Sequence, residues 1–164
     1  MLTLPEIIER PARVYVYITF TVTMEEMKKP ADEGFSRLFA WLGEKGIAPA
    51  GAPFYNYRRI DMADTLDVEA GVPVAATGAD DGDIRFGELP AGRFAALEWH
   101  GHYDALITAT AVLLGWAMLV GNRFDMHEAA DGDHFACRLE IYETDPTDLP
   151  PEQWVTRLAF KLAD

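Results

Sequence analysis

Three charged side chains lie in predicted strands at positions where they could do chemistry: Glu69, Glu140 and Arg157. A carboxylate held in apolar surroundings can act as a general acid or base, or can bind a cation, if a partner compensates its charge. If Glu140 is buried, Arg157 and Arg138 are candidate partners for it. The pattern therefore indicates a site that uses one or two charged groups.

Aromatic side chains occur on the same strands and on neighbouring ones. Tyr55 and Tyr57 alternate in a short predicted strand, Trp99 lies at the end of another, and Tyr142 shares the strand of Glu140. Aromatic rings can clamp a flat ligand and gain about 0.5–1.5 kcal/mol beyond the burial of their area. The alternative interpretation is that these rings belong to the hydrophobic core.

The histidines and the single cysteine give weaker signals. His100 and His102 flank Gly101, but no third ligand follows nearby, and a zinc site needs three or four. We predict instead a strand-to-helix turn in which one of these histidines accepts a hydrogen bond from the first helical N–H groups. Cys137 cannot form an intrachain disulfide and is predicted to be a buried thiol. No metal ion and no cofactor are predicted.

Charge and composition exclude several classes of protein. The formal net charge of −13 repels phosphate backbones, so direct binding to nucleic acid is not expected. The single cysteine and the lack of a signal-peptide pattern favour a cytoplasmic protein. The stretch 105–122 carries no charge, but it is shorter than the roughly 20 residues of a spanning helix. We read it as a buried helix, so no membrane association is expected.

Alternating and helical patterns place these residues on a repeated plan. Strands are predicted over 6–10, 13–22, 54–58, 66–74, 84–99, 135–142 and 154–162, with a loop from Asp125 to Asp133. Helices are predicted from an N-cap at Asp32 to a stop at Gly46, with Phe35, Leu38, Phe39 and Leu42 in one apolar stripe, and over about 103–120. The motif Glu-x-Pro-Ala begins at Glu9 and again at Glu88. This predicts an α+β fold from a tandem βαββ repeat, about 6–78 and 84–164, in a single domain, 1–164. The antiparallel sheet would carry its helices on one side and a central groove between the repeats.

Several segments together resemble the GyrI-like small-molecule-binding domain, the effector-binding module of AraC-type and multidrug-responsive transcription regulators. The matching segments are Leu89-Pro90-Ala91-Gly92-Arg93, Trp99-His100-Gly101-His102-Tyr103-Asp104-Ala105-Leu106, Leu139-Glu140-Ile141-Tyr142-Glu143-Thr144-Asp145-Pro146, Asp67-Val68-Glu69-Ala70-Gly71-Val72-Pro73-Val74 and Trp154-Val155-Thr156. The resemblance implies a pseudo-symmetric fold whose central pocket binds hydrophobic, often cationic, molecules between aromatic rings and an acidic group. Some members of that family open strained rings of DNA-alkylating compounds, and others resemble an inhibitor of DNA gyrase.

The last strand departs from the family pattern. Where cation-binding members carry Glu after the Thr of this strand, the chain has Arg157, and Lys161 stands where Pro is frequent. Aligning the copies sets Glu69 against Arg157. Either these two side chains pair and leave a neutral site, or the preferred ligand is anionic or polar.

The sequence thus predicts a stand-alone protein that binds a small hydrophobic or aromatic molecule. The expected ligand-binding residues are Tyr55, Tyr57, Glu69, Trp99, Glu140, Tyr142 and Arg157. One alternative is a ring-opening hydrolase with Glu69 or Glu140 as general acid or base. Another is a module that binds a protein partner such as gyrase. The sequence leaves the oligomeric state open.

Overall fold

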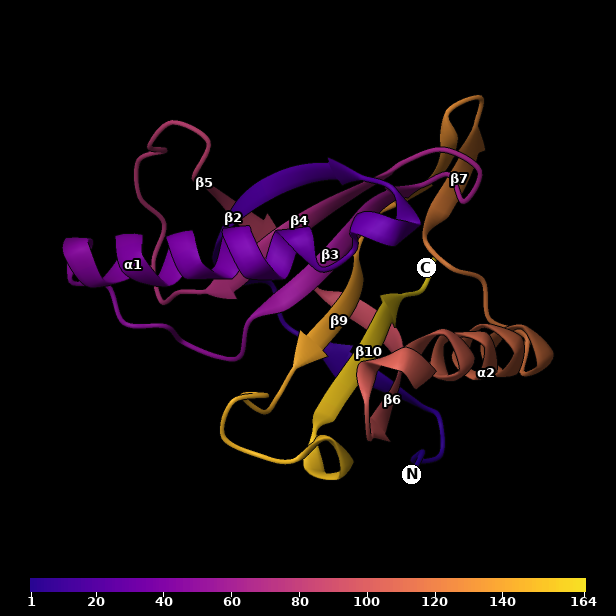
Figure 1. Cartoon of the computed structure of the whole chain (residues 1–164). Helices are drawn as coiled ribbons and strands as arrows, with labels where there is room; N and C mark the ends of the chain where they lie inside the picture. The colour runs from indigo at the N-terminus through magenta and orange to yellow at the C-terminus, as the bar shows by residue number, and fades with distance from the viewer.

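The computed structural model describes residues 1–164 and contains one ten-stranded antiparallel sheet with two α-helices (Figure 1). The first half of the chain supplies β2 (Arg13–Val22), α1 (Ser36–Lys45), β3 (Phe54–Ile60) and β4 (Leu66–Pro73). The second half supplies β6 (Gly92–His100), α2 (Leu106–Leu119), β9 (Arg138–Tyr142) and β10 (Val155–Lys161). Strands β1 (Glu6–Arg10) and β5 (Arg85–Leu89) precede β2 and β6, and a hairpin of β7 (Met126–Ala129) and β8 (Gly132–Phe135) precedes β9.

Strand order shows how the halves join. The sheet runs β1-β6-β10-β9-β3-β4-β2-β5, so β9 and β3 meet in the middle. At this junction Tyr55 lies directly opposite Glu140. The two leading strands cross over: β1 pairs with β6 of the second half, and β5 pairs with β2 of the first. Glu69 and Arg157 occupy comparable places, opposite Thr19 and Glu98 respectively.

Both helices cover the same face of the sheet. Leu38 and Leu42 of α1 pack on Val16 of β2, and Leu113 of α2 packs on Leu158 of β10. Paired residues of neighbouring strands share a face, and the registers connect the positions under α1 to those under α2. The prediction of an α+β fold with helices on one side of an antiparallel sheet is confirmed.

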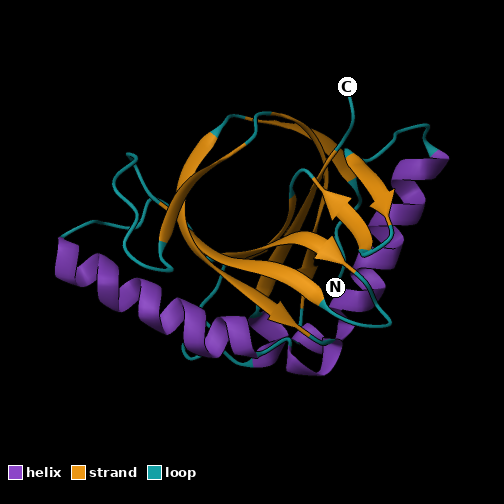
Figure 2. Cartoon of the chain, turned by 90° about the horizontal axis from the view of Figure 1, so that it is seen from above, coloured by secondary structure: helices purple, strands orange, loops and turns teal.

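The opposite face is closed by the curl of the sheet itself. Figure 2 shows the strands bent into a half-barrel with both helices outside the curl. Leu89 of the edge strand β5 and Phe94 of β6, which is next to the other edge, belong to one buried cluster with Tyr15, Phe54 and Cys137. We call this side the concave face. Its core therefore forms without any helix behind it.

The first helix differs in detail from the prediction. The segment Pro30–Phe35 forms a π-helical turn, and α1 begins only at Ser36. Asp32 lies inside that turn and is not the helix N-cap. Phe39 was expected in the buried stripe, but it is 42% exposed. The helix ends as predicted, because Gly46 adopts a left-handed backbone with φ of 67°.

The second helix is apolar all round, but it is buried on only one side. Leu106, Ala109, Leu113 and Ala117 face the sheet. Ile107 and Met118 point away from it and are 65% and 68% exposed. The prediction of a buried helix is thus correct for the side of α2 that faces the sheet. It is wrong for the outer side, which carries no charge but is exposed. No helix of this structure combines the length and apolar character that crossing a bilayer requires.

The β7–β8 hairpin is an element that the sequence did not predict. The segment from Asp125 to Asp133 was expected to be a loop, and Phe135 to open the following strand. Instead, Met126 pairs with Phe135, and His134 pairs with Arg59 at the end of β3. Its side chains are exposed or half-buried, so no alternating apolar pattern marks these short strands.

Candidate functional site

A buried carboxylate marks the middle of the helix-covered face. Glu140 on β9 is 9% exposed and lies between Tyr55 of β3 and Leu158 of β10. The Tyr142 hydroxyl donates to its Oε1 at 2.5 Å, and the Tyr57 hydroxyl donates to its Oε2 at 3.3 Å. Three residues predicted for the site therefore contact one another.

The surroundings favour the neutral forms of these groups. Burial raises the pKa of Glu140, although the two tyrosine hydrogen bonds and the charge of Arg138 oppose the shift. Burial also raises the pKa of Tyr57 and Tyr142 well above the usual value, and the nearby Glu140 adds to it. A positive charge placed here would favour the ionised carboxylate and would gain from the faces of the rings.

Aromatic rings enclose Glu140. The Tyr55 ring centroid lies 5.3 Å from that of Tyr142, with the rings at 90°, and 6.1 Å from that of Tyr57. Phe35 lies 5.7 Å from Tyr55, and Tyr103 lies 5.5 Å from Tyr142. We call Phe35, Tyr55, Tyr57, Tyr103 and Tyr142 the aromatic cluster. Its rings pack on one another over the carboxylate.

A short helical segment, Met24–Phe35, lies against this cluster and is tied to it by Tyr55. The Tyr55 hydroxyl donates to the Met27 carbonyl at 2.8 Å and accepts from the Ala31 N–H at 2.9 Å. The segment contains a 3₁₀ turn and the π-helical turn, and its residue Phe35 belongs to the cluster. Such π-helical turns are frequent at functional sites.

Arg138 and Thr156 add polar groups beside Glu140. The Arg138 guanidinium lies 4.7 Å from the ring centroids of both Phe135 and Phe160. Its buried Nε and the buried Oγ1 of Thr156 make no hydrogen bond. Thr156 pairs with Tyr142 across β9 and β10, so its side chain shares the face of the cluster. Buried polar atoms without partners are rare and are concentrated here.

Glu69 lies on the concave face, away from the cluster. It is 6% exposed, and its Oε1 accepts from the Tyr15 hydroxyl at 2.6 Å and from Asn56 Nδ2 at 2.9 Å. Burial raises its pKa, and these two hydrogen bonds oppose the shift. The alternation of β4 already indicated this placement, because Glu69 faces the opposite side of the sheet from Val68 and Ala70.

Arg157 also lies on the concave face. It donates to Glu98 in a close ion pair, and its Nε lies 3.8 Å from Glu143. Burial raises the pKa of Glu98, but hydrogen bonds from His100 and Arg157 outweigh this and hold it below the usual value. The pairing of Glu69 with Arg157, one of the two alternatives, does not occur.

Trp99 and the two histidines organise the end of β6. The Trp99 ring packs against the hydrophobic core between α2 and the sheet, and its Nε1 donates to the His102 carbonyl at 2.9 Å. His102 Nδ1 accepts from the Asp104 N–H at 3.1 Å at the start of a 3₁₀ turn. The prediction that a histidine satisfies the first helical N–H groups is confirmed. Trp99 does not join the rings around Glu140.

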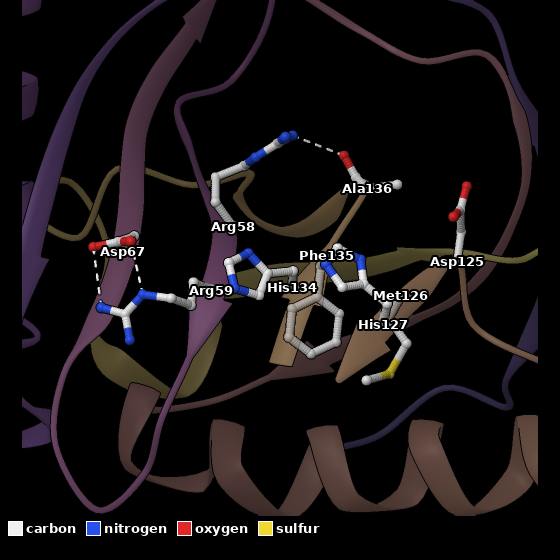
Figure 3. Close-up of a pocket in the computed structure, with 9 residues that line it drawn as sticks. All are labelled: Arg58, Arg59, Asp67, Asp125, Met126, His127, His134, Phe135 and Ala136. Atoms are coloured by element: carbon white, nitrogen blue, oxygen red, sulfur yellow. Dashed lines mark hydrogen bonds and ion pairs between the residues drawn. The ribbon is translucent and has the colours of Figure 1, made fainter. Parts of the chain in front are cut away.

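A polar pocket of about 370 Å³ lies where the β7–β8 hairpin meets β3 (Figure 3). Its charged groups are largely engaged within the chain. Arg59 Nε donates to Asp67 at 2.8 Å, Arg58 donates to the Ala136 carbonyl at 2.8 Å, and His134 lies 2.7 Å from Asp131. Arg59 Nη1 also donates to the Asp131 carbonyl at 2.8 Å. This contact and that of Arg58 fix the hairpin to the sheet, which is a structural role.

The sequence model of the GyrI-like small molecule binding domain matches residues 4–163. The chain belongs to this family. No curated protein matches the sequence. This GyrI-like chain superposes on the C-terminal domain of EcmrR with a TM-score of 0.73 at 19% identity, covering 98% of both chains. The EcmrR chain has also been solved in a complex with DNA. This chain superposes on it with a TM-score of 0.75 at 19% identity, over 98% of this chain and 57% of the EcmrR chain.

Two further solved structures share the GyrI-like fold. SAV2435, solved bound to tetraphenylphosphonium, gives a TM-score of 0.60 at 10% identity, covering 98% of this chain and 94% of that one. A hydrolase from Listeria innocua gives a TM-score of 0.63 at 14% identity, covering 97% of this chain and 91% of the hydrolase chain. At these identities the likeness establishes the fold alone.

The predicted site residues thus divide between two faces of the GyrI-like sheet. Four lie together on the helix-covered face: Tyr55, Tyr57, Glu140 and Tyr142. The sequence interpretation missed Phe35 and Tyr103 as members of this cluster. Tyr103 could have been found, because it belongs to a segment that carried the family resemblance. Phe35 was assigned to the helix core, since its spacing with Leu38 and Leu42 fits a buried stripe.

Proposed function

We propose that this chain binds a small hydrophobic or aromatic cation at Glu140, between the rings of the aromatic cluster. The observation that carries the proposal is a buried carboxylate whose two nearest hydroxyls belong to Tyr57 and Tyr142. Ring faces attract cations, and the carboxylate supplies a full opposite charge in a setting of low polarity.

The position of Arg157 removes the main objection to a cationic ligand. Its guanidinium pairs with Glu98 on the opposite face, so it does not neutralise Glu140. Arg138 is the cation that acts on Glu140, and no ion pair joins the two. The binding of tetraphenylphosphonium by SAV2435, which has the same fold, supports a lipophilic cation as the ligand class.

Binding at this place requires the aromatic cluster to open. The rings contact one another over Glu140, so a ligand must displace some of them. We expect the segment Met24–Phe35 to be the element that moves, because it is the part of the cover that belongs to no strand. Two hydrogen bonds of the Tyr55 hydroxyl and the packing of Met27, Ala31 and Phe35 hold it at the cluster. Affinity is then reduced by the free energy of this opening.

Titration calorimetry with tetraphenylphosphonium tests the proposal. We expect Glu140→Gln to weaken binding about tenfold or more, because it removes the counter-charge. Glu69→Gln is the matched control, since it makes the same change to a glutamate buried on the other face. Equal weakening in both variants, or no binding by the folded wild type, would contradict the proposed site.

A ring-opening hydrolase is the second candidate, and Glu140 is again the residue that favours it. Burial raises the pKa of Glu140 and so favours the protonated form that a general acid needs, and a neighbour of the same fold is a hydrolase. Mass spectrometry of a strained cyclopropane compound incubated with the protein would detect addition of water. Turnover that disappears in Glu140→Gln and persists in Glu69→Gln would support catalysis, and turnover in both variants would exclude this role.

A further inference from the structure

A second pocket lies on the concave face, on the opposite side of the sheet from Glu140. Its volume is about 300 Å³, at the lower end of the range for ligand sites. It opens where β3 and β9 meet the ends of β1 and β5, and Phe54, Leu89 and Ile141 supply apolar walls. These three side chains also belong to the core of the concave face, so the pocket has a rigid apolar floor.

Three arginines converge on this pocket: Arg10, Arg13 and Arg157. They come from β1, β2 and β10, and the lining contains a single acidic residue, Glu143. The chain as a whole carries 27 acidic and 14 basic residues, so this surplus of positive charge is opposite to that of the molecule. A concave surface of one sign concentrates ligands of the other sign.

Arg10 is the most exceptional of the three. Its guanidinium makes no hydrogen bond or ion pair, and it lies 5.6 Å from the ring centroid of Phe94. Burial lowers its pKa, and the charges of Arg13 and Arg157 lower it further. Arg13 has only the Ala50 carbonyl as partner, at 2.6 Å. Two guanidinium groups with unused donors therefore adjoin an apolar floor, and neither of them forms an ion pair.

We propose that this pocket binds a small organic carboxylate whose apolar body lies on Phe54, Leu89 and Ile141. The carboxylate meets the guanidinium groups of Arg10 and Arg13, which can present paired donors to its two oxygens. Arg157 is already paired with Glu98 and completes the positive rim. Inorganic phosphate should bind more weakly, because it has no apolar part and would leave the apolar floor in contact with water.

The test uses ¹⁵N–¹H NMR titration of the whole chain with 3-phenylpropionate. Inorganic phosphate and the neutral 3-phenylpropanamide serve as probes that lack the ring or the charge. We expect saturable shifts at Gly51, Ala52 and Leu89, which weaken with added salt, and weaker binding of both comparison probes. Loss of either arginine should raise Kd about tenfold to a hundredfold.

Three variants decide between the outcomes. The double variant Arg10→Gln with Arg13→Gln removes the positive charge of the pocket. Ala52→Trp fills the pocket and keeps both arginines. Arg85→Gln is the control, because it removes an exposed arginine of β5 that lies outside the pocket. Loss of binding in the first two with retention in the third supports the site. If the double variant fails to fold, Ala52→Trp and the wild-type shift map decide.

Several results would overturn the inference. They are absence of binding to folded wild type at tens of millimolar probe, unchanged affinity in a folded double variant, and phosphate binding as tight as the carboxylate. Shifts confined to Phe35, Tyr103 and the segment Met24–Phe35 would also overturn it, because they would place the anion at the other face.

Discussion

The two faces of the sheet each bury one glutamate, and they stabilise it differently. On the concave face, Glu69 receives hydrogen bonds from Tyr15 and Asn56 inside a core that the curled sheet closes by itself. On the other face, Glu140 receives both of its hydrogen bonds from tyrosines of a ring cluster that a separate helical segment covers. The first glutamate is part of a closed scaffold, whereas the second lies under a helical segment outside the sheet.

Truncation of a concave-face core residue should have the largest effect. Phe54 is 2% exposed and packs on Tyr15, so Phe54→Ala should lower the free energy of unfolding by about 3–5 kcal/mol. Phe39→Ala is the control and should cost clearly less, because Phe39 on α1 is 42% exposed. Urea unfolding measures both. Similar losses for the two variants would show that the concave core is not what closes that face.

Removal of Glu69 should cost less, but still measurably. Glu69→Ala leaves the Tyr15 hydroxyl and the Asn56 amide buried without an acceptor, which should destabilise the fold by about 1–3 kcal/mol. Glu69→Gln retains an acceptor oxygen and should lose less. Thermal unfolding compares the two variants, and an equal loss would show that the charge of Glu69, rather than its hydrogen bonds, is what matters.

Replacement of Glu140 by glutamine should have an effect on stability that depends on pH. The pKa of Glu140 is raised in the folded protein, so its contribution to stability is present below the unfolded-state pKa and is lost as pH rises through the folded-state value. Glu140→Gln should therefore stabilise the ligand-free protein at pH 7 by about 1–2 kcal/mol. Urea unfolding at pH 7 and at about pH 3.5 measures this gain. It should vanish at the lower pH, and a gain that persists there would refute burial of the charge as its cause.

The outer side of α2 should matter least. Ile107 is 65% exposed and contributes nothing to the cover of the sheet, so Ile107→Lys should change the free energy of unfolding by no more than about 0.5 kcal/mol. Leu113→Ala on the inner side should cost about 2–5 kcal/mol. Urea unfolding of this pair measures how far the helix acts through one side only.

Sequence patterns predicted the strands well because most of them alternate. Val16 and Ile18 mark β2, and Leu66 and Val68 mark β4, with the periodicity of a half-buried strand. The β7–β8 hairpin lacks this signal, since it is held by polar contacts such as that of His134 with Asp131. Absence of charge in α2 indicated burial, but one chain cannot show which side of a helix is covered.

The site could be predicted in part for a similar reason. Tyr55, Tyr57, Glu140 and Tyr142 fall on one face because paired strands bring them together at the junction of β3 and β9. Glu69 and Arg157 were assigned to the same groove through their equivalent places in the two halves, although alternation turns both toward the other face. The pairing of Arg157 with Glu98 depends on strand register, which sequence spacing alone did not reveal.

The exchange of the two leading strands has a consequence for how the molecule comes apart. Since β1 completes the edge beside β6, and β5 completes the edge beside β2, neither half of the chain is finished without a piece of the other. A cut in the polar connector near Gly82 would yield fragments that each present an unpaired strand edge. We therefore expect the two fragments to aggregate when they are separate. When they are mixed, β1 can pair with β6 and β5 with β2, and the native sheet should form again.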